Sequence, residues 1–292
     1  MTSKLKFLPC LDSAEMARQR RSELNIERAV AAALGASAVR ATIRGNYQNR
    51  LGDTVDLNHF LEQAYDKKES IAPDAVLPSC EPVTFPETRV LVTNETTLGA
   101  ARRLVESGLK PLALNFANGV HAGGGFLIGA RAQEEVLCRS STLYSTLVCD
   151  PMYEAHQCRP RPDSTSWSIY SPDTPIFRTD DGVELEKPWL LSFITCAAPY
   201  APSVGQPESG DLLQQRIHRI LEIARAYGYT TLVLGAWGCG AFRNDAARTA
   251  RDFRHALENE FQGAFADVVF AITDRSPERK SLGPFRDVFT ER

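Results

Sequence analysis

The chain has 292 residues, of which 43% are hydrophobic and 24% are charged, as in an average soluble globular protein. Its 33 Lys and Arg and 36 Asp and Glu leave a net charge of −3. This composition excludes a disordered chain, a collagen-like chain and a small disulfide-stabilised protein. It also provides no overall basic field of the kind that holds duplex nucleic acid, so an anionic ligand would need local donors.

The cysteine and histidine patterns carry no metal or disulfide signature. The seven cysteines include no CxxC pair, and the five histidines form no HxxxH or HxxEH motif. We therefore expect reduced thiols and no metal site. The first twelve residues hold too short an apolar stretch for a signal peptide, and the longest apolar run, from Ala29, is far below the roughly 18 residues of a membrane span. These patterns predict a soluble cytoplasmic protein.

Helical patterns dominate the N-terminal part of the chain. Residues 13–38 are rich in Ala, Leu, Arg and Glu and predict one helix, with Ser13 as its N-cap and Gly35 near its end. Residues 56–68 predict a second, short helix.

A connector follows these helices. Four prolines between residues 73 and 86 cannot continue a helix or a central strand. We place a boundary here, between an N-terminal helical accessory segment with its connector (1–88) and a catalytic core (89–292). The alternative, a long surface loop within one domain, stays open.

Strands and helices alternate after the connector. Strands are predicted at 89–94, 111–116, 189–198, 230–236 and 266–273, and helices at 95–108, 133–148, 209–228 and 244–261. The strands are continuous apolar runs, which is typical of a sheet covered on both faces with much parallel pairing. The predicted fold is therefore α/β, with a mixed, largely parallel sheet, helices on both faces and an N-terminal helical extension. Residues 149–188 predict a loop excursion with a hairpin at the Asp-Gly pair 181–182.

Two glycine-rich segments follow predicted strands. The first contains Gly123, Gly124 and Gly125, and the second contains Gly235, Gly238 and Gly240. In such sheets ligands bind beyond the carboxyl ends of the strands, and glycines let backbone N–H groups approach a phosphate. Neither segment has GxGxxG or GxxxxGK[ST] spacing. Together they predict a clamp for a diphosphate.

The sequence Gln133-Glu134-Glu135 opens a predicted helix seven residues after the first glycine segment. Adjacent carboxylates at a helix start usually only complement the helix dipole. Beside a sugar–phosphate ligand, one glutamate can protonate a leaving oxygen and then activate water. Neighbouring side chains on a helix diverge by about 100°, so the other would position a ribose.

Four more side chains are candidates for this site. Asn115 and Asn118 frame the end of the preceding strand and could bridge sugar hydroxyls. A helix N-terminus lowers a glutamate pKa, whereas an acid catalyst at neutral pH needs it raised. Phe126 and Phe242 would supply the necessary desolvation if they wall the pocket.

The segment NFANGVHAGGGFLIGARAQEEVLCRSSTLY resembles the signature of bacterial-type poly(ADP-ribose) glycohydrolases, which have a macrodomain fold. That signature is a triple glycine, six to eight residues, then QEE. GAWGCGAFRND is similar to the diphosphate loop of the family, which adds Cys239 and Ala241 to the candidate ligand-binding residues. Ala122 departs from the pattern, where proline is expected. The resemblance spans nearly the whole chain and is strongest from about residue 89 to 274.

The resemblance implies an enzyme that hydrolyses the ribose–ribose bonds of poly(ADP-ribose). It makes Glu135 the general acid and base, lets Glu134 orient the riboses, and places Gln133 among the ligand-binding residues. It implies no metal or cofactor, and action mainly at chain ends with ADP-ribose as product. Its substrates would be poly(ADP-ribose) or ADP-ribosylated proteins, acted on by a monomer without sequence-specific nucleic acid or a membrane.

Three other functions stay open. A non-catalytic reader of ADP-ribose would not need the QEE sequence, which favours an enzyme. A hydrolase of single ADP-ribosyl groups would use the same chemistry on another leaving group. A purely structural protein would not need two glycine loops at strand ends. Residues 1–88 could brace the fold or cover the adenine.

Overall fold

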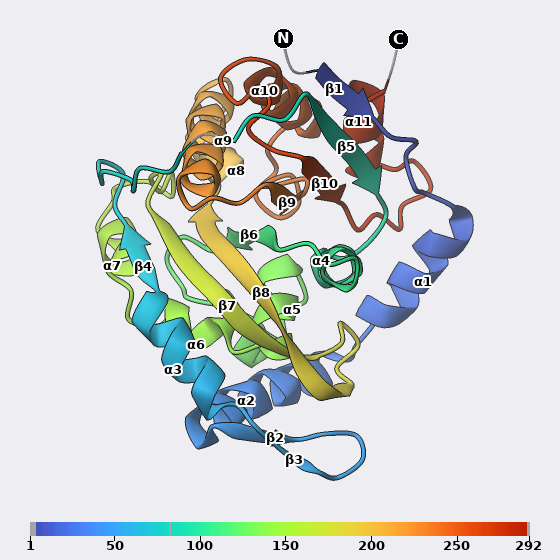
Figure 1. The fold of residues 1–292 in the computed structure, drawn as a ribbon, viewed down its shortest axis with the longest axis vertical. Helices are drawn as coiled ribbons and strands as arrows, with labels where there is room; N and C mark the ends of the chain where they lie inside the picture. Colours follow the sequence, from blue (N-terminus) through green and yellow to red (C-terminus); the bar gives the residue numbers. More distant parts are fainter. Residues whose placement is uncertain (1–3, 82, 291–292) are drawn as a thin grey trace.

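An eight-stranded sheet organises the chain in the computed structural model, which describes residues 4–81 and 83–290 (Figure 1). Its strand order is β1-β5-β10-β9-β6-β8-β7-β4. The first six strands in this order, β1-β5-β10-β9-β6-β8, each run parallel to their neighbours, whereas β7 is antiparallel to both β8 and β4. The predicted largely parallel sheet is therefore confirmed. The strands are β1 (Lys4–Phe7), β4 (Glu69–Ile71), β5 (Glu87–Thr93), β6 (Pro111–Ala117), β7 (Ser168–Arg178), β8 (Glu184–Ala197), β9 (Thr231–Leu234) and β10 (Asp267–Ala271).

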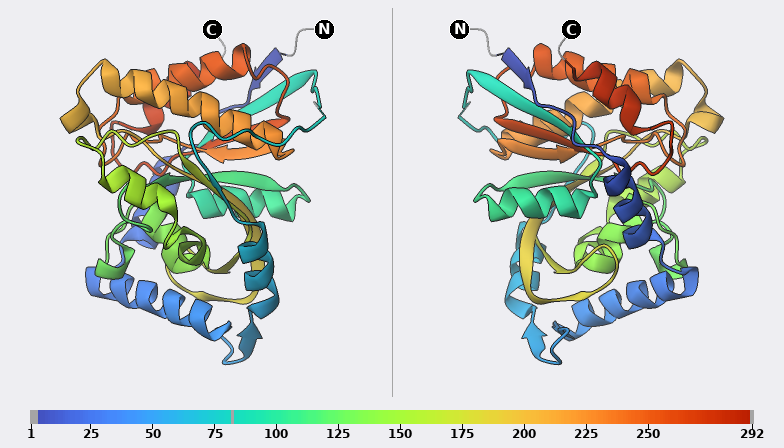
Figure 2. Two further views of the ribbon diagram at one scale, coloured as in Figure 1. Left: turned by 90° about the vertical axis from the view of Figure 1, so that its left-hand side faces the viewer. Right: turned by 90° about the vertical axis from the view of Figure 1, so that its right-hand side faces the viewer.

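Helices cover both faces of the sheet because successive residues of its central strands point to opposite faces. In β5, Val90 and Val92 belong to one core cluster and Leu91 to the other. Figure 2 shows α9 and α10 on one side of the sheet and α4 on the other. The helices over the first cluster are α9 (Glu208–Ala226), α10 (Ala246–Glu258) and α11 (Leu282–Val288), and those over the second are α4 (Thr97–Glu106), α5 (Gln133–Ser140), α6 (Leu143–Leu147) and α7 (Pro151–Gln157).

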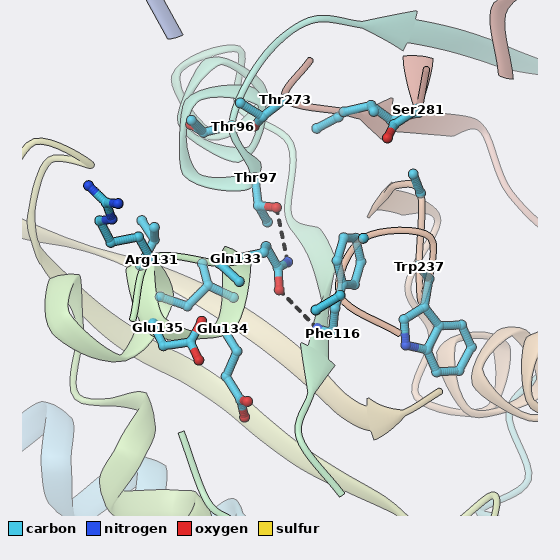
Figure 3. A pocket seen from close by; sticks show the side chains of 18 of the residues that line it. Thr96, Thr97, Phe116, Arg131, Gln133, Glu134, Glu135, Trp237, Thr273 and Ser281 are labelled. Carbon is cyan, nitrogen blue, oxygen red and sulfur yellow. Dashed lines mark hydrogen bonds between the residues drawn. The ribbon is translucent and has the colours of Figure 1, made fainter. Parts of the chain in front are cut away.

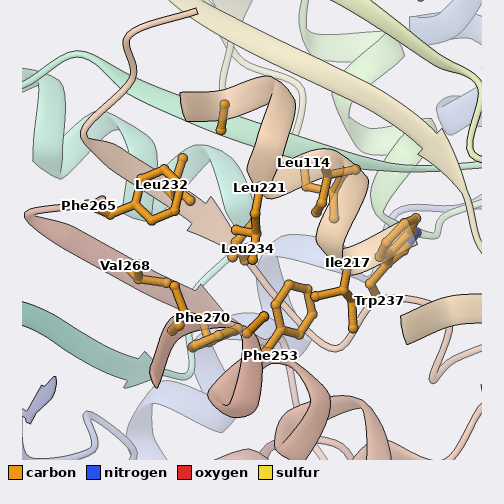
Figure 4. Packing of buried hydrophobic residues seen from close by; sticks show 14 of the residues in the cluster. Leu114, Ile217, Leu221, Leu232, Leu234, Trp237, Phe253, Phe265, Val268 and Phe270 are labelled. Carbon is orange, nitrogen blue, oxygen red and sulfur yellow. The ribbon is translucent and has the colours of Figure 1, made fainter. Parts of the chain in front are cut away.

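The larger cluster fixes the position of the strand ends that carry the site. Phe253 of α10 packs on Phe270 of β10 with ring centroids 5.3 Å apart, and Ile217 of α9 and Trp237 complete the buried layer (Figure 4). Each fully buried Ile or Phe contributes about 1.5–3 kcal/mol to folding. The carboxyl ends of β9 and β10 therefore rest on a rigid base.

The N-terminal segment forms two helices where one is predicted. They are α1 (Ala14–Leu24) and α2 (Arg28–Arg44), so the prediction of a single helix over 13–38 is wrong. Ser13 caps α1 as expected, because its Oγ accepts the Met16 N–H at 3.0 Å. Gly35 does not end a helix but lies inside α2. After α2 the chain forms a hairpin of β2 (Asn46–Gln48) and β3 (Thr54–Asp56), and then α3 (Asn58–Lys67).

The described part of the N-terminal segment shares the sheet of the core. β1 extends one edge by pairing with β5, and β4 extends the other by pairing with β7. The boundary drawn after residue 88 therefore does not coincide with a break in the sheet. The connector carries no helix or strand in the described residues from 73 to 86, and its Pro82 lies outside them.

The segment from 133 to 188 differs most from its prediction. The helix predicted over 133–148 is interrupted at Ser141, which is extended and donates its hydroxyl to the Leu137 carbonyl at 2.7 Å. The predicted loop excursion over 149–188 is wrong, because it contains α7, β7 and the start of β8. A bulge between Ser171 and Thr174 accommodates Pro172 in β7. The predicted hairpin at 181–182 is confirmed, since the Gly182 N–H donates to the Thr179 carbonyl.

Short elements complete the chain. They are the 3-10 turn η1 (Phe126–Ile128) and α8 (Ala201–Val204). Among residues 4–81 and 83–290, none of the helices combines the length and the apolar character that crossing a bilayer requires.

Candidate active site

A cavity of about 470 Å³ opens where β5, β6, β9 and β10 end (Figure 3). This is the edge at which ligands bind in parallel α/β sheets. The cavity has a polar wall at the start of α5 and a glycine-rich wall after β9. The sequence-predicted residues that line it are Asn118, Gln133, Glu134, Glu135, Gly238, Gly240, Ala241 and Phe242.

Glu134 is buried, with 4% of its surface exposed, and both its carboxyl oxygens accept hydrogen bonds. Oε2 accepts the Asn118 N–H at 2.7 Å, and Oε1 accepts the Asn115 amide nitrogen at 3.4 Å. Burial raises the pKa of Glu134 to about 8, and the neighbouring Glu135 adds to the effect, while these donors oppose it. Glu134 is therefore mostly protonated at neutral pH.

Glu135 differs from its neighbour in its hydrogen bonding. Its Oε1 accepts the Gly125 N–H at 2.9 Å, and its Oε2 is buried without a partner among the described residues. Of the four carboxyl oxygens in the pair, this one alone has no protein donor within that part of the chain. It is the oxygen that remains for a substrate group.

The triple glycine wraps closely around these carboxyls. Gly124 has a φ of +57°, and a Cβ there would lie 2.4 Å from Glu135 Oε1. Gly123 has a φ of +70°, and its Cβ would lie 2.9 Å from the Phe126 ring. Only glycine satisfies both the backbone conformation and the close approach.

The N–H groups of the triple glycine do not form the predicted diphosphate clamp. The Gly124 N–H donates to the His121 carbonyl at 3.0 Å, and the Gly125 N–H donates to Glu135. The Gly123 N–H helps to hold Glu134. This loop therefore positions the glutamates.

The loop after β9 offers the free donors instead. Its turn is closed by bonds such as that from the Cys239 N–H to the Ala236 carbonyl at 3.1 Å, and Gly238 has a φ of +74°. Four of its N–H groups donate to no acceptor in the described part of the chain, namely those of Gly238, Gly240, Ala241 and Phe242. Backbone donors without partners suit an anion such as a diphosphate. Phe242 meets Tyr200 edge to face at 5.7 Å.

Seven predicted ligand-binding residues do not line the cavity: Asn115, Gly123, Gly124, Gly125, Phe126, Gly235 and Cys239. Asn115 is fully buried and holds Glu134. Phe126 is only 2% exposed and its ring packs against Gly123, so it does not form part of the cavity wall. The Cys239 thiol points to Thr249 Oγ1 at 3.6 Å. Gly235 instead permits close packing, since a Cβ there would lie 2.7 Å from the Ala271 carbonyl oxygen.

Gln133 lines the cavity, but its amide is occupied by the protein. Its Oε1 accepts the Phe116 N–H at 2.9 Å, and its Nε2 donates to the Leu114 carbonyl at 2.8 Å and to Thr97 Oγ1 at 3.0 Å (Figure 3). This amide ties the start of α5 to β6 and α4. It therefore sets where the two glutamates stand.

The N-terminal helices brace the loop that leads into α5. Arg28 Nε donates to the Ile128 carbonyl and Arg131 Nη1 to the Ile26 carbonyl, each at 2.8 Å. A Cβ at Gly35 of α2 would lie 2.8 Å from the Phe126 carbonyl oxygen. The bracing role considered for residues 1–88 is thus visible in their contacts.

Sequence reasoning missed several polar residues of the cavity wall and one residue of α1. They are Thr96, Thr97, Arg131, Asp180, Thr273, Arg275, Ser281 and Leu24. The strand-end rule, applied to β5 and β10, could have found Thr96, Thr97 and Thr273. Leu24 and Asp180 come from α1 and the β7–β8 turn, and no sequence signal links those segments to the site.

Comparison with known proteins gave concordant matches. A family model described as the microbial-type PARG catalytic domain matches residues 35–179. The structure of poly(ADP-ribose) glycohydrolase from Thermomonospora curvata is 38% identical, with a TM-score of 0.84, and covers 89% of this chain and 100% of that one. The same protein bound to the inhibitor ADP-HPD is 40% identical, with a TM-score of 0.83 and coverages of 89% and 99%.

A second organism gives a similar result. Poly(ADP-ribose) glycohydrolase from Deinococcus radiodurans in complex with ADP-ribose is 38% identical, with a TM-score of 0.71 and coverages of 80% and 98%. No curated protein sequence gave a significant match.

Proposed function

The chain belongs to the microbial-type poly(ADP-ribose) glycohydrolases, hydrolases that act on glycosidic bonds, and we propose that Glu135 is the group that transfers the proton. The observation that carries this assignment is the unpartnered Oε2 of Glu135, beside a Glu134 whose two oxygens are both occupied. A general acid needs a free oxygen within reach of the leaving group. Glu134 then orients the ribose and holds the loop.

The proposed reaction balances with one carboxyl group. Glu135 donates its proton to the 2′ oxygen of the departing ribose while the bond from C1″ to that oxygen breaks and its electron pair stays on the oxygen. The remaining ribose becomes an oxocarbenium-like cation. Water adds to C1″ and gives a proton back to Glu135. A diphosphate held by the free N–H groups of the loop after β9 would stabilise the developing positive charge.

We also propose action at chain ends. A volume of about 470 Å³ suits one nucleotide-sized unit, since drug-sized ligand pockets span about 300–1,000 Å³. Leu24 of α1 also lines the cavity. A helix in the cavity wall limits the space for a second unit, which supports release of single ADP-ribose units.

The test compares wild type with Glu135→Gln on purified poly(ADP-ribose), with free ADP-ribose as the readout. The amide keeps the shape and removes the proton, so we expect a loss of at least about a hundredfold. ADP-ribose binding should persist in the variant. Glu106→Gln, on the exposed face of α4, is the matched control.

Other outcomes would separate the alternatives. A wild type that binds ADP-ribose but releases none would be a reader. Release from a mono-ADP-ribosylated protein, without release from polymer, would indicate a mono-ADP-ribosyl hydrolase. Appearance of oligomers before ADP-ribose would contradict action at chain ends.

A further inference from the structure

His156 of α7 is a buried side chain that the proposed mechanism does not use. It is 3% exposed, and both of its ring nitrogens lie within hydrogen-bond distance of other segments. Nδ1 lies 3.0 Å from the Gly119 carbonyl oxygen, and Nε2 lies 3.1 Å from the backbone nitrogen of Thr165. The ring thus joins the loop after β6 to the loop before β7.

The partners of this ring fix which nitrogen carries the proton. A backbone N–H group only donates, so Nε2 is the acceptor, and a carbonyl oxygen only accepts, so Nδ1 is the donor. The Thr165 hydroxyl accepts the Trp167 N–H at 3.1 Å and can donate its own proton to the same Nε2 at 2.8 Å. All three contacts are satisfied together only by a neutral ring with its proton on Nδ1.

The surroundings of His156 favour this neutral form. Burial lowers the pKa of the ring, and the bond to the Gly119 carbonyl opposes this effect. The guanidiniums of Arg216 and Arg159 also lower the pKa, whereas the carboxylate of Asp163 raises it. Asp163 is itself paired with Arg159 at 2.6 Å. The ring is therefore neutral at pH 7.

The loop that this ring holds also supplies a donor to Glu134. Gly119 follows Asn118, whose N–H donates to Glu134 Oε2 at 2.7 Å. The Asn118 side chain closes the same turn, because its Oδ1 accepts the N–H groups of Val120 and His121 at 2.9 and 3.0 Å. A displacement of the Gly119 carbonyl therefore moves the donor to Glu134.

Two other contacts dock this loop on the same base. Gln157, next to His156 on α7, donates its Nε2 to the Val120 carbonyl at 2.7 Å. A Cβ at Gly119 would clash with Ser164 Oγ, so the loop lies directly against the segment that precedes β7. Adjacent side chains of α7 thus hold adjacent carbonyls of the loop.

We propose that His156, supported by Gln157, is a positioning residue for the hydrolysis: by donating from Nδ1 to the Gly119 carbonyl, it holds the Asn118 N–H against Glu134. His156 is not among the described residues that line the cavity. Losing its bond should therefore impair the chemical step more than the binding of substrate. The inference rests on the proposed function, because it concerns the carboxyls to which the hydrolysis is assigned.

The test compares two amides at position 156, with kcat and KM of ADP-ribose release from poly(ADP-ribose) as readouts. His156→Asn places an amide N–H group where Nδ1 lies and can keep the bond to Gly119. His156→Gln places its amide oxygen near Nε2 and can keep only the bond to Thr165. We expect His156→Gln to lose about tenfold in kcat with KM within about threefold of wild type, and His156→Asn to stay close to wild type in both. Tm should fall by similar amounts, since each variant loses one bonded end.

Two further measurements keep the inference testable if these buried variants do not fold. Gln157→Glu is exposed and isosteric, and its carboxylate cannot donate to the Val120 carbonyl, so kcat should fall severalfold. NMR of the imidazole nitrogens in the wild type should show Nε2 of His156 without a proton at pH 7. The matched control is His255→Gln, which changes an exposed histidine of α10 and should leave kcat unchanged.

The outcomes separate this inference from the proposed function. Equal kcat values in His156→Asn and His156→Gln, or a kcat that follows Tm across the variants, overturn the inference, because both patterns mark a merely structural role. A proton on Nε2 in the wild type, or an unchanged kcat in Gln157→Glu, also overturns it. In each case activity of the wild type and its loss in Glu135→Gln preserve the proposed function. A wild type without activity on the polymer overturns both.

Discussion

The raised pKa of Glu134 predicts an unusual dependence of stability on pH. The pKa shifts from 4.5 to about 8 on folding. Between these values the folded state binds more protons than the unfolded state, so the free energy of unfolding falls as pH rises and levels off above pH 8. At about 1.4 kcal/mol per pH unit, ionisation of Glu134 lowers the free energy of unfolding by about 5 kcal/mol between pH 4 and pH 8.

Glu134→Gln removes this cost because the amide does not ionise. The amide also places an NH₂ group where the carboxyl accepted a donor, at a cost of about 1–3 kcal/mol that does not depend on pH. The informative quantity is therefore the change with pH. At about 2 °C per kcal/mol for a chain of this size, Tm of the variant relative to wild type should rise by about 10 °C from pH 4 to pH 8.

Thermal unfolding followed by circular dichroism at several pH values measures this difference. Glu106→Gln, an exposed glutamate paired with Arg102, is the matched control and should show a flat difference. A difference between Glu134→Gln and wild type that stays constant from pH 4 to pH 8 would refute the argument that burial outweighs the donors around this carboxyl.

Two further variants test the close contacts of the glycines. Gly124→Ala places a Cβ 2.4 Å from Glu135 Oε1 and should lower kcat by about a hundredfold while circular dichroism stays native; wild-type kcat would contradict the role given to the loop. Gly35→Ala meets the Phe126 carbonyl at 2.8 Å and should destabilise by about 1–3 kcal/mol in denaturant titration. Gly283→Ala, with nothing nearer than 3.6 Å, is the control for both and should be neutral or slightly stabilising.

The central strands could be predicted because the apolar residues that form them are consecutive in the sequence. β5, β6, β9 and β10 are buried on both faces, so each reads as a continuous apolar run. β1 has only four residues at the sheet edge, which alternate between exposed and half-buried. A pattern this short does not predict a strand. β7 was missed because its two prolines argue against a strand, and only pairing with β8 reveals the bulge that accepts one of them.

The sequence predicted which residues gather at the site better than it predicted where their backbone N–H groups point. The triple glycine and Gln133-Glu134-Glu135 do lie together, but backbone torsions decide where an N–H group points. Positive φ at Gly123 and Gly124 turns that loop toward the glutamates, and the donors left for an anion lie after β9. Asp180 reaches the site from a turn 45 residues beyond Glu135 in sequence, which only the folded hairpin explains.

The two adjacent glutamates differ in their hydrogen-bond partners, and opposing effects act on the pKa of Glu134. The start of α5 favours carboxylates, whereas burial favours carboxylic acids. For Glu134 burial prevails although N–H donors surround it, and its neighbour's charge adds to the effect. Burial therefore favours an uncharged Glu134 inside the enclosing loop. The loop can then enclose both side chains, and Glu135 keeps one oxygen without a protein partner for the leaving ribose.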